Sequence, residues 1–142
     1  MKKIFLCGPI ENVNKSLRLD WRVKATNALT ESGFEVITPV TPMTDIDKQG
    51  HFSNQDIFDF AINNLKRTDI VLADVRYLER ENTGTAAELM YAHMLDIPII
   101  GWMDKVETPR RVFINVLVKQ MYYNLEEAIL AVQRYYEERS DN

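Results

Sequence analysis

A glutamate in an otherwise apolar segment is the residue of this chain that most clearly suggests chemistry. Glu88 closes the run Gly84-Thr85-Ala86-Ala87-Glu88, and alanine, leucine, methionine and tyrosine surround it. A carboxylate in the first turn of such a helix should be partly desolvated and stabilised in its ionised form by the helix dipole, which suits a nucleophile. The run is also a capping-box pattern, in which Glu88 only accepts a hydrogen bond from the Thr85 amide, and spacing alone favours this interpretation. Gly84 supports a ligand site, because a glycine at the mouth of a sheet lets a small molecule approach the backbone closely.

The composition limits what such a site can act on. The chain has 142 residues, of which 46% are hydrophobic, and this is the size of one domain, residues 1–142, with its own core. It carries 21 acidic and 17 basic side chains, for a net charge of -4, and no basic stripe is interleaved with aromatic residues. These features argue against a nucleic acid polymer as a partner. We therefore expect a small-molecule substrate.

The cysteine, the histidines and the first residues of the chain argue against a disulfide-bonded, a metal-binding, and a secreted or membrane-spanning protein. The single cysteine, Cys7, cannot form an internal disulfide, and its apolar surroundings indicate a buried small hydrophobic residue rather than a nucleophile. His51 and His93 do not belong to a Cys/His cluster, so we expect no metal site and no cofactor. The start Met1-Lys2-Lys3 precedes an apolar run too short for a signal peptide or a membrane span. A cytoplasmic protein without membrane contact is the expectation.

The elements that must position Glu88 alternate between strands and helices. Short apolar runs predict strands over 3–7, 34–38, 70–73 and 97–102, and 121–124 is a candidate for a short fifth strand. Helical spacing predicts helices over 17–32, 53–65, 85–95, 110–120 and 125–136. The 85–95 helix is apolar almost all round, which predicts that it is buried. Together the elements indicate an α/β layered fold with a mainly parallel sheet.

Three loops should gather at one edge of this sheet. Ligands of parallel sheets bind at the carboxyl ends of the strands, which here lead into residues 8–14, 75–83 and 103–110. Glu88 follows the second of these loops. A further polar segment from 39 to about 52 has no periodicity, and its length makes it a candidate for covering a substrate.

Three segments carry a resemblance to a known family. The opening Ile4-Phe5-Leu6-Cys7-Gly8-Pro9-Ile10, the strand end Ala73-Asp74, and Asn82-Thr83-Gly84-Thr85-Ala86-Ala87-Glu88-Leu89-Met90-Tyr91-Ala92 resemble the nucleoside 2-deoxyribosyltransferases over nearly the whole chain. The resemblance implies a flavodoxin-like fold with a five-stranded sheet flanked by helices. In this family and in the related 2'-deoxynucleoside 5'-phosphate N-hydrolases, the glutamate of the G-T-x-x-E segment attacks the anomeric carbon, and Glu88 matches it.

The implied activity is transfer of the 2-deoxyribosyl group between nucleobases through a covalent deoxyribosyl-Glu88 intermediate. One alternative is an N-glycoside hydrolase acting on 2'-deoxynucleosides or their 5'-monophosphates. A second alternative, from another class, is a nucleotide-binding module without turnover. Substrates would be a small 2'-deoxynucleoside and a free nucleobase.

The resemblance also implies roles for residues around Glu88. Asn115, in Ile114-Asn115-Val116-Leu117, matches an asparagine that reaches into a neighbouring subunit's site and binds the sugar 5'-hydroxyl, so we expect at least a dimer. Asn82 stands where transferases have an aspartate and the hydrolases a serine. Gly84 and Thr85 would contact the substrate. Gly8 and Pro9 would shape the floor under the base or sugar, although an ordinary strand-ending turn explains them equally well.

Two departures from the family pattern leave the proton donor open. Phe5 replaces a tyrosine whose hydroxyl lies near the nucleophile, and Ala61 stands where an acidic residue usually faces the leaving base. Asp59 is two residues away and should point elsewhere on its helix. Asp74, at the end of its strand, is the other candidate acid, and capping of the following loop is an alternative role for it.

Overall fold

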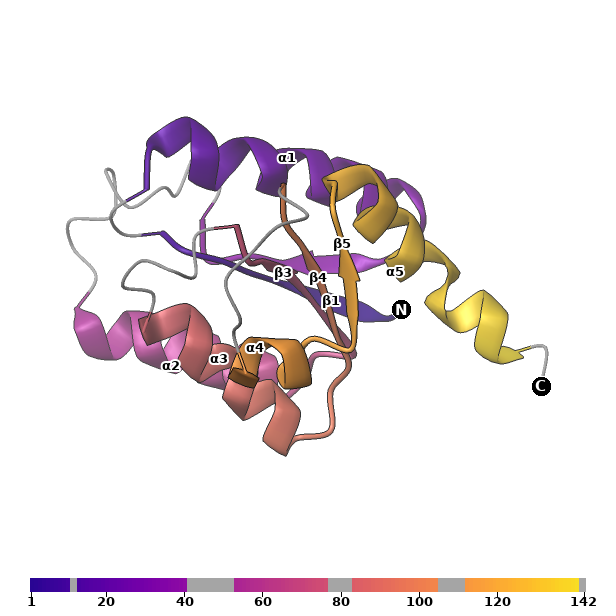
Figure 1. Ribbon diagram of the computed structural model, residues 1–142. Coiled ribbons are helices and arrows are strands. Elements are labelled where there is room, and N and C mark those ends of the chain that lie inside the picture. The colour runs from indigo at the N-terminus through magenta and orange to yellow at the C-terminus, as the bar shows by residue number, and fades with distance from the viewer. Residues whose placement is uncertain (11–12, 41–52, 77–82, 105–111, 141–142) are drawn as a thin grey trace.

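A five-stranded parallel sheet forms the centre of the computed structural model (Figure 1), which describes residues 1–10, 13–40, 53–76, 83–104 and 112–140. The strands are β1 (Lys3–Cys7), β2 (Glu35–Ile37), β3 (Ile70–Asp74), β4 (Ile99–Trp102) and β5 (Gln120–Tyr122). Their order is β2-β1-β3-β4-β5, and every neighbouring pair is parallel. This is the flavodoxin-like order, so the predicted fold class is confirmed.

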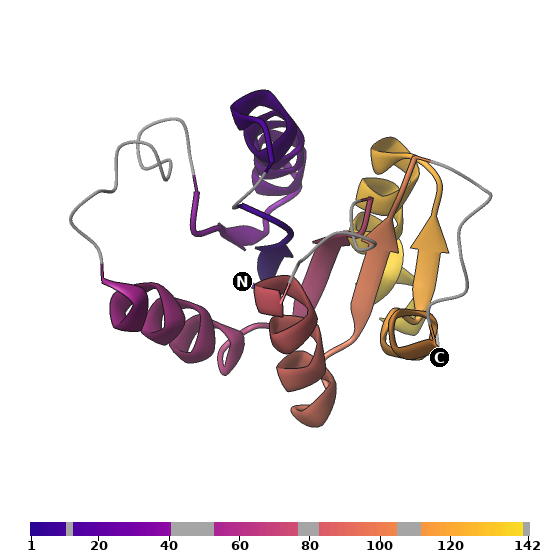
Figure 2. The same cartoon turned by 60° about the vertical axis from the view of Figure 1, so that its left-hand side comes forward.

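Five helices cover the sheet in two layers. Helices α1 (Lys15–Glu31) and α5 (Leu125–Ser140) pack side by side on one face. Helices α2 (Asn54–Leu65), α3 (Thr83–Met94) and α4 (Val112–Leu117) lie on the other face (Figures 1 and 2). Each helix links two parallel strands or closes the chain after the last one, as the alternation in the sequence predicted.

Local signals account for the helix ends that the sequence predicted well. Ser53 caps α2 by accepting a hydrogen bond from the Asp56 amide, and the Asp56 carboxylate accepts one from the Ser53 amide. Gly33 follows α1 with a φ of 92°, a left-handed conformation that glycine adopts without steric cost. Both ends therefore follow from a few neighbouring residues.

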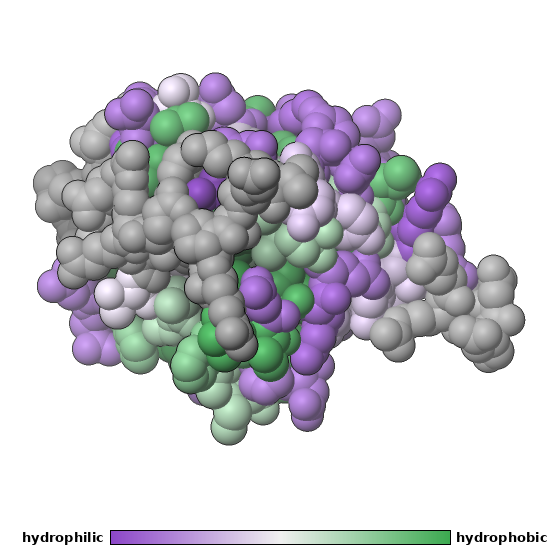
Figure 3. Space-filling model, in the orientation of Figure 1, coloured by the Kyte–Doolittle hydropathy of each residue, from purple (hydrophilic) through white to green (hydrophobic). Residues whose placement is uncertain are grey.

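The outer helices bury less than their apolar patterns predicted. In α3 only Thr85, Leu89 and Ala92 are buried, so the prediction of a helix buried all round was wrong. In α2 only Leu65 is buried, and Ile57 and Phe60 of its apolar stripe are exposed. For α3 the physical reason is that an outer helix has one face on the sheet and the other in solvent. Figure 3 shows the resulting apolar surface over α3 and α4.

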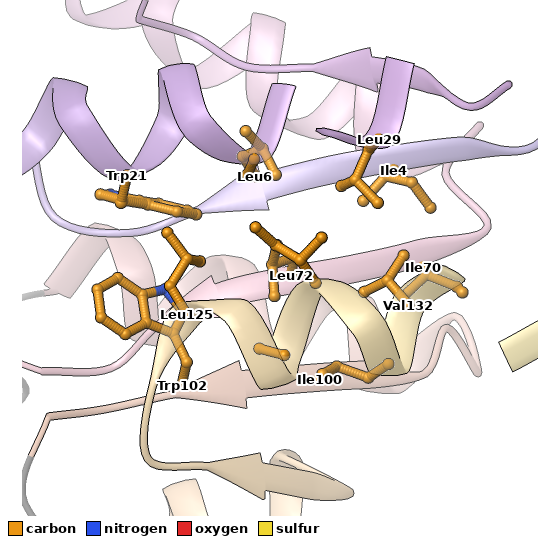
Figure 4. Close-up of a cluster of buried hydrophobic side chains, with 13 residues drawn as sticks. Ile4, Leu6, Trp21, Leu29, Ile70, Leu72, Ile100, Trp102, Leu125 and Val132 are labelled. Carbon is orange, nitrogen blue, oxygen red and sulfur yellow. The ribbon is translucent and has the colours of Figure 1, made fainter. Parts of the chain in front are cut away.

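The core is divided by the sheet into two clusters. The α1/α5 side contains residues shown in Figure 4, among them Ile4, Leu6, Leu72 and Ile100. The α2/α3/α4 side contains Phe5, Cys7, Val71, Ala73, Leu89 and Leu117. Alternate residues of β1 therefore point to opposite faces, as a strand requires. This alternation directs the Cys7 side chain toward α3.

Two negative observations concern the described ranges alone. No helix among them is both long and apolar enough to span a membrane. They also hold no group of three His, Cys, Asp or Glu side chains able to bind a metal ion. The segment from 39 to 52, predicted to cover a substrate, lies largely outside the described residues.

Candidate active site

The candidate site lies at the carboxyl ends of β1 and β3, in the centre of the sheet. These strands are hydrogen-bonded neighbours, with Cys7 in register with Ala73. The chain leaves β1 toward β2 on one side and β3 toward β4 on the other, so this is the point where the strand order reverses. Sheets of this type bind their ligands in the crevice at such a point. The site therefore consists of residues at the ends of β1 and β3 and on the helix that follows β3.

Glu88 lies on the second turn of α3 and faces the end of β1. The Cys7 thiol donates a hydrogen bond to its carboxylate, with Sγ 3.3 Å from Oε2. Helix α3 begins at Thr83, so Thr85 is inside the helix and cannot be its N-cap. The capping-box interpretation is therefore wrong. The first-turn placement was wrong for the same reason, and the helix dipole contributes less to Glu88 than expected.

The surroundings of Glu88 favour its neutral form. Burial raises the pKa of this carboxyl from 4.5 to about 7, while the hydrogen bond from Cys7 and the charge of Arg22 act in the opposite direction. Near neutral pH the group is present as both acid and carboxylate. A carboxyl with a pKa in this range can attack as an anion and is also easily displaced again from an ester.

Cys7 is fully buried, as the sequence predicted, but it also makes a polar contact. Burial and the nearby Glu88 charge raise the pKa of the thiol well above its ordinary value. The sulfur therefore stays protonated and remains a hydrogen-bond donor over the physiological range. Its second neighbour is the Thr85 carbonyl oxygen, 4.0 Å from Sγ.

Arg22, on α1, is a buried cation that the sequence analysis missed. Its guanidinium donates hydrogen bonds of 2.9 Å to the carbonyl oxygens of Leu6 and Gly8 and to the Thr38 hydroxyl. Burial lowers its pKa to about 10, against the charges of Cys7, Glu88 and Asp74, so it is cationic at neutral pH. Arg22 thus fixes the end of β1 and places a positive charge behind the site.

A signal for Arg22 is present in the sequence. Arg18, Arg22, Ala25 and Leu29 are all buried and follow one helical stripe. Two arginines on the inward stripe of a helix indicate buried cations with partners, because an unpaired buried charge is too costly.

Asp74 is engaged by a neighbouring arginine. Arg76 donates from Nε to Oδ1 and from Nη2 to Oδ2, both at 2.9 Å, and its backbone amide also bonds Oδ1. The guanidinium further bonds the Leu17 carbonyl oxygen and stacks 4.2 Å from the Trp102 ring centroid. Because both carboxylate oxygens accept bonds from one bidentate partner, this geometry favours an anchoring role over proton donation.

The two glycines of the predicted site, Gly8 and Gly84, differ in how closely other residues pack against them. A Cβ on Gly8 would lie 2.9 Å from the Asp74 Cβ and 3.1 Å from the Trp21 ring. Packing within the protein therefore requires Gly8, and its expected place in the floor under the base or sugar stays a prediction. A Cβ on Gly84 would meet no packed neighbour within 4 Å among the described residues, so their packing does not require a glycine at this position.

Of the remaining predicted residues, some lie near the end of β1 and others are exposed on the outer helices. Pro9 is buried beside Gly8, and Thr85 is buried against the end of β1. Asp59 is exposed on α2, where it accepts a bond from the Gln55 amide, while Ala61 packs into the core. Asn115 is exposed on α4. Asn82 lies outside the described residues.

Comparison with known proteins gives the fold and the family. Among solved structures, a 2-deoxyribosyltransferase from Bacillus psychrosaccharolyticus is 21% identical, with a TM-score of 0.69 over 89% of this chain and 90% of that one. A 2-deoxyribosyltransferase from Leishmania mexicana is 14% identical, with a TM-score of 0.71 over 94% and 98%. The CMP N-glycosidase of Clostridium botulinum is 18% identical, with a TM-score of 0.67 over 94% and 99%. These similarities show a common fold.

Sequence comparison is more specific. A search of curated proteins finds no match. By contrast, a family profile with the description Nucleoside 2-deoxyribosyltransferase matches residues 4–127. Since this match spans most of the chain and includes every described residue of the site, the protein belongs to the nucleoside 2-deoxyribosyltransferase family.

Proposed function

We propose that this protein transfers the 2-deoxyribosyl group of a 2'-deoxynucleoside from one nucleobase to another, with Glu88 as the nucleophile. Membership of the family supports an enzyme of the deoxyribosyltransferase and N-glycosidase group. The observation that carries the specific proposal is the Glu88 carboxyl, whose pKa is about 7, at the point where the strand order reverses. A Cβ on Gly84, one turn before Glu88, would meet no packed neighbour within 4 Å among the described residues, which supports access for a sugar from that side.

The proposed reaction has two displacements at one carbon. The Glu88 carboxylate attacks C1', and the C1'–N bond breaks through an oxocarbenium-like transition state, so that the base leaves with the bonding electron pair and takes up a proton. The product is a deoxyribosyl ester of Glu88. A ring nitrogen of a second base then attacks C1' from the vacated face, loses its proton, and releases the Glu88 carboxylate unchanged.

One feature of the sequence supports a transferase over a hydrolase. Asn115 matches the residue that binds a free 5'-hydroxyl in the transferases. The second candidate, hydrolysis of a deoxynucleoside or its 5'-monophosphate, uses the same first step, and the fold shared with a CMP N-glycosidase supports it.

Product analysis tests the proposal. The protein is incubated with deoxyinosine and adenine, and separately with each deoxynucleoside 5'-monophosphate, and the products are separated by chromatography. We expect deoxyadenosine and hypoxanthine from the first mixture. Accumulation of free base without deoxyadenosine would establish the hydrolase instead. A protein that binds these compounds but releases no base would be the binding module.

A variant pair tests the role of Glu88. Glu88→Gln should abolish turnover and the deoxyribosyl mass increase that acid quenching traps on the wild-type protein. Glu127→Gln is the matched control, because Glu127 is exposed on α5 on the opposite face of the sheet. It should behave as wild type. Turnover by Glu88→Gln near the wild-type rate would refute the nucleophile assignment.

A further inference from the structure

We propose that Cys7 is a positioning residue for the nucleophile, and that its thiol holds and orients the Glu88 carboxylate through a hydrogen bond. The inference rests on the proposed role of Glu88. It goes beyond that role because it gives a function in catalysis to the chain's single cysteine, which the sequence indicated to be a buried core residue.

Geometry is the first support. Sγ lies 3.3 Å from Glu88 Oε2, and Cys7 is the one described donor to this carboxylate. The two residues are 81 positions apart, on β1 and α3, so the bond joins the two elements that form the site. It engages one carboxylate oxygen. The second oxygen is then available for attack on C1'.

Rigidity of the donor is the second support. Cys7 is fully buried and is held in the sheet by pairing with Ala73 of β3. The carbonyl oxygens on both sides of it, those of Leu6 and Gly8, are fixed by Arg22. A glutamate side chain has three rotatable bonds, and a donor on a fixed strand restricts them.

Burial and the neighbouring Glu88 carboxylate keep the thiol in the protonated form, which can donate, because both raise its pKa. Arg22 from α1 and Asp74 from β3 are the other charged groups that act on Cys7, with opposite effects, and burial outweighs both. The bond also favours the ionised form of Glu88, because a thiol donates to a carboxylate. It therefore supports attack by Glu88 and its later departure from the ester.

Phe5 and Cys7 belong to the same cluster on the same face of β1. Phe5 has no hydrogen-bond donor in its side chain, whereas the Cys7 thiol, two residues further along the strand, donates to Glu88.

The test compares three variants by steady-state kinetics across pH. Cys7→Ala should reduce kcat about tenfold with little change in KM, and should move the acid limb of kcat/KM to higher pH, because the bond that favours ionised Glu88 is gone. Cys7→Ser restores a donor and should recover most of kcat and the original limb. Val71→Ala, which removes volume from the same cluster without touching the bond, should lose stability but keep the limb.

A second measurement needs no cysteine variant. Because the chain has one cysteine, its S–H stretching band in the infrared belongs to Cys7 alone. The band should shift as Glu88 ionises, with a midpoint near 7, and Glu88→Gln should abolish the shift. If the frequency of the S–H band in the wild-type protein did not change with pH, the inference would be overturned even if Cys7→Ala failed to fold.

Each outcome separates the two proposals. If Cys7→Ala keeps the wild-type kcat and the same acid limb of kcat/KM while Glu88→Gln is inactive, only the positioning role is overturned. Equal losses in Cys7→Ala and Cys7→Ser with an unmoved limb also overturn it, since they indicate packing only. Full turnover by Glu88→Gln would overturn the proposed function itself.

Discussion

At the scale of single residues, the nucleophile is placed at a cost to stability. Burial raises the pKa of Glu88 in the folded protein to about 7, above its ordinary value of 4.5. The unfolded chain therefore binds fewer protons between these two values, and the free energy of unfolding should fall as the pH rises through this window. Such a cost is typical of a group that is held for chemistry rather than for folding.

Glu88→Gln should accordingly stabilise the protein at high pH. We expect a gain of about 2 kcal/mol in the free energy of unfolding at pH 8, less than the full shift would give because the side chain is partly accessible. The gain should disappear below pH 4.5, where Glu88 is protonated in both states. Urea unfolding at pH 4 and pH 8 measures it. An equal difference at both pH values would contradict the ionisation argument.

The same ionisation should control the rate. Attack requires the carboxylate, so kcat/KM should rise about tenfold per pH unit below 7 and level off above it. Initial rates from pH 5 to 9 with one deoxynucleoside measure the limb. A profile already flat at pH 5 would mean that burial does not perturb the nucleophile.

The two aspartates that sequence patterns offered as proton donors should behave differently. Asp59→Asn changes an exposed side chain and should leave kcat within about twofold. Asp74→Asn breaks the bidentate pair with Arg76, whose side chain is 11% exposed, and should cost about 2 kcal/mol of stability. Chemical unfolding and kinetics are measured together. Asp74→Asn with full stability and no turnover would instead identify Asp74 as the acid.

At the scale of elements, the ends of β1 and the start of α3 tolerate different changes. Gly8→Ala forces a Cβ to within 2.9 Å of Asp74 and should cost about 1–3 kcal/mol, because the end of β1 must shift. Gly84→Ala meets open space on a helix and should be neutral or stabilising. If Gly84 lines the sugar site, Gly84→Ala should in addition raise the KM for the deoxynucleoside. A Gly8→Ala protein as stable as wild type would contradict the packing argument.

Local signals explain which elements could be predicted. The cap at Ser53, the left-handed Gly33 and the apolar run of β1 depend on neighbouring residues, and each was located from sequence. The start of α3 was not, because the helix begins at Thr83, two residues before the position that the pattern ending at Glu88 indicated. The contacts of Arg22 and Cys7 were missed for another reason. They join residues distant in sequence, and periodicity carries no information about such pairs.

At the scale of the whole molecule, one face of the sheet leaves apolar side chains in solvent. Met90 and Met94 on α3 are 42% and 68% exposed, and Val112, Phe113 and Val116 on α4 are 56%, 73% and 58% exposed. The two helices pack together, and Figure 3 shows apolar residues gathered over them. A contiguous apolar surface of this kind indicates a protein contact. Asn115, the residue expected to reach a neighbouring site, is exposed on α4 among them.

Association of two copies through this surface should therefore be needed for activity. Phe113→Glu places a charge at the most exposed of these five side chains and should convert an oligomer into a monomer, with loss of turnover but an intact fold. Sedimentation at the assay concentration, circular dichroism and kinetics measure the three properties. Leu130→Glu is the matched control, because Leu130 is also exposed but lies on α5, on the opposite face. A wild-type protein that sediments as a monomer with full activity would show that each copy completes its own site and that Asn115 has no part in it.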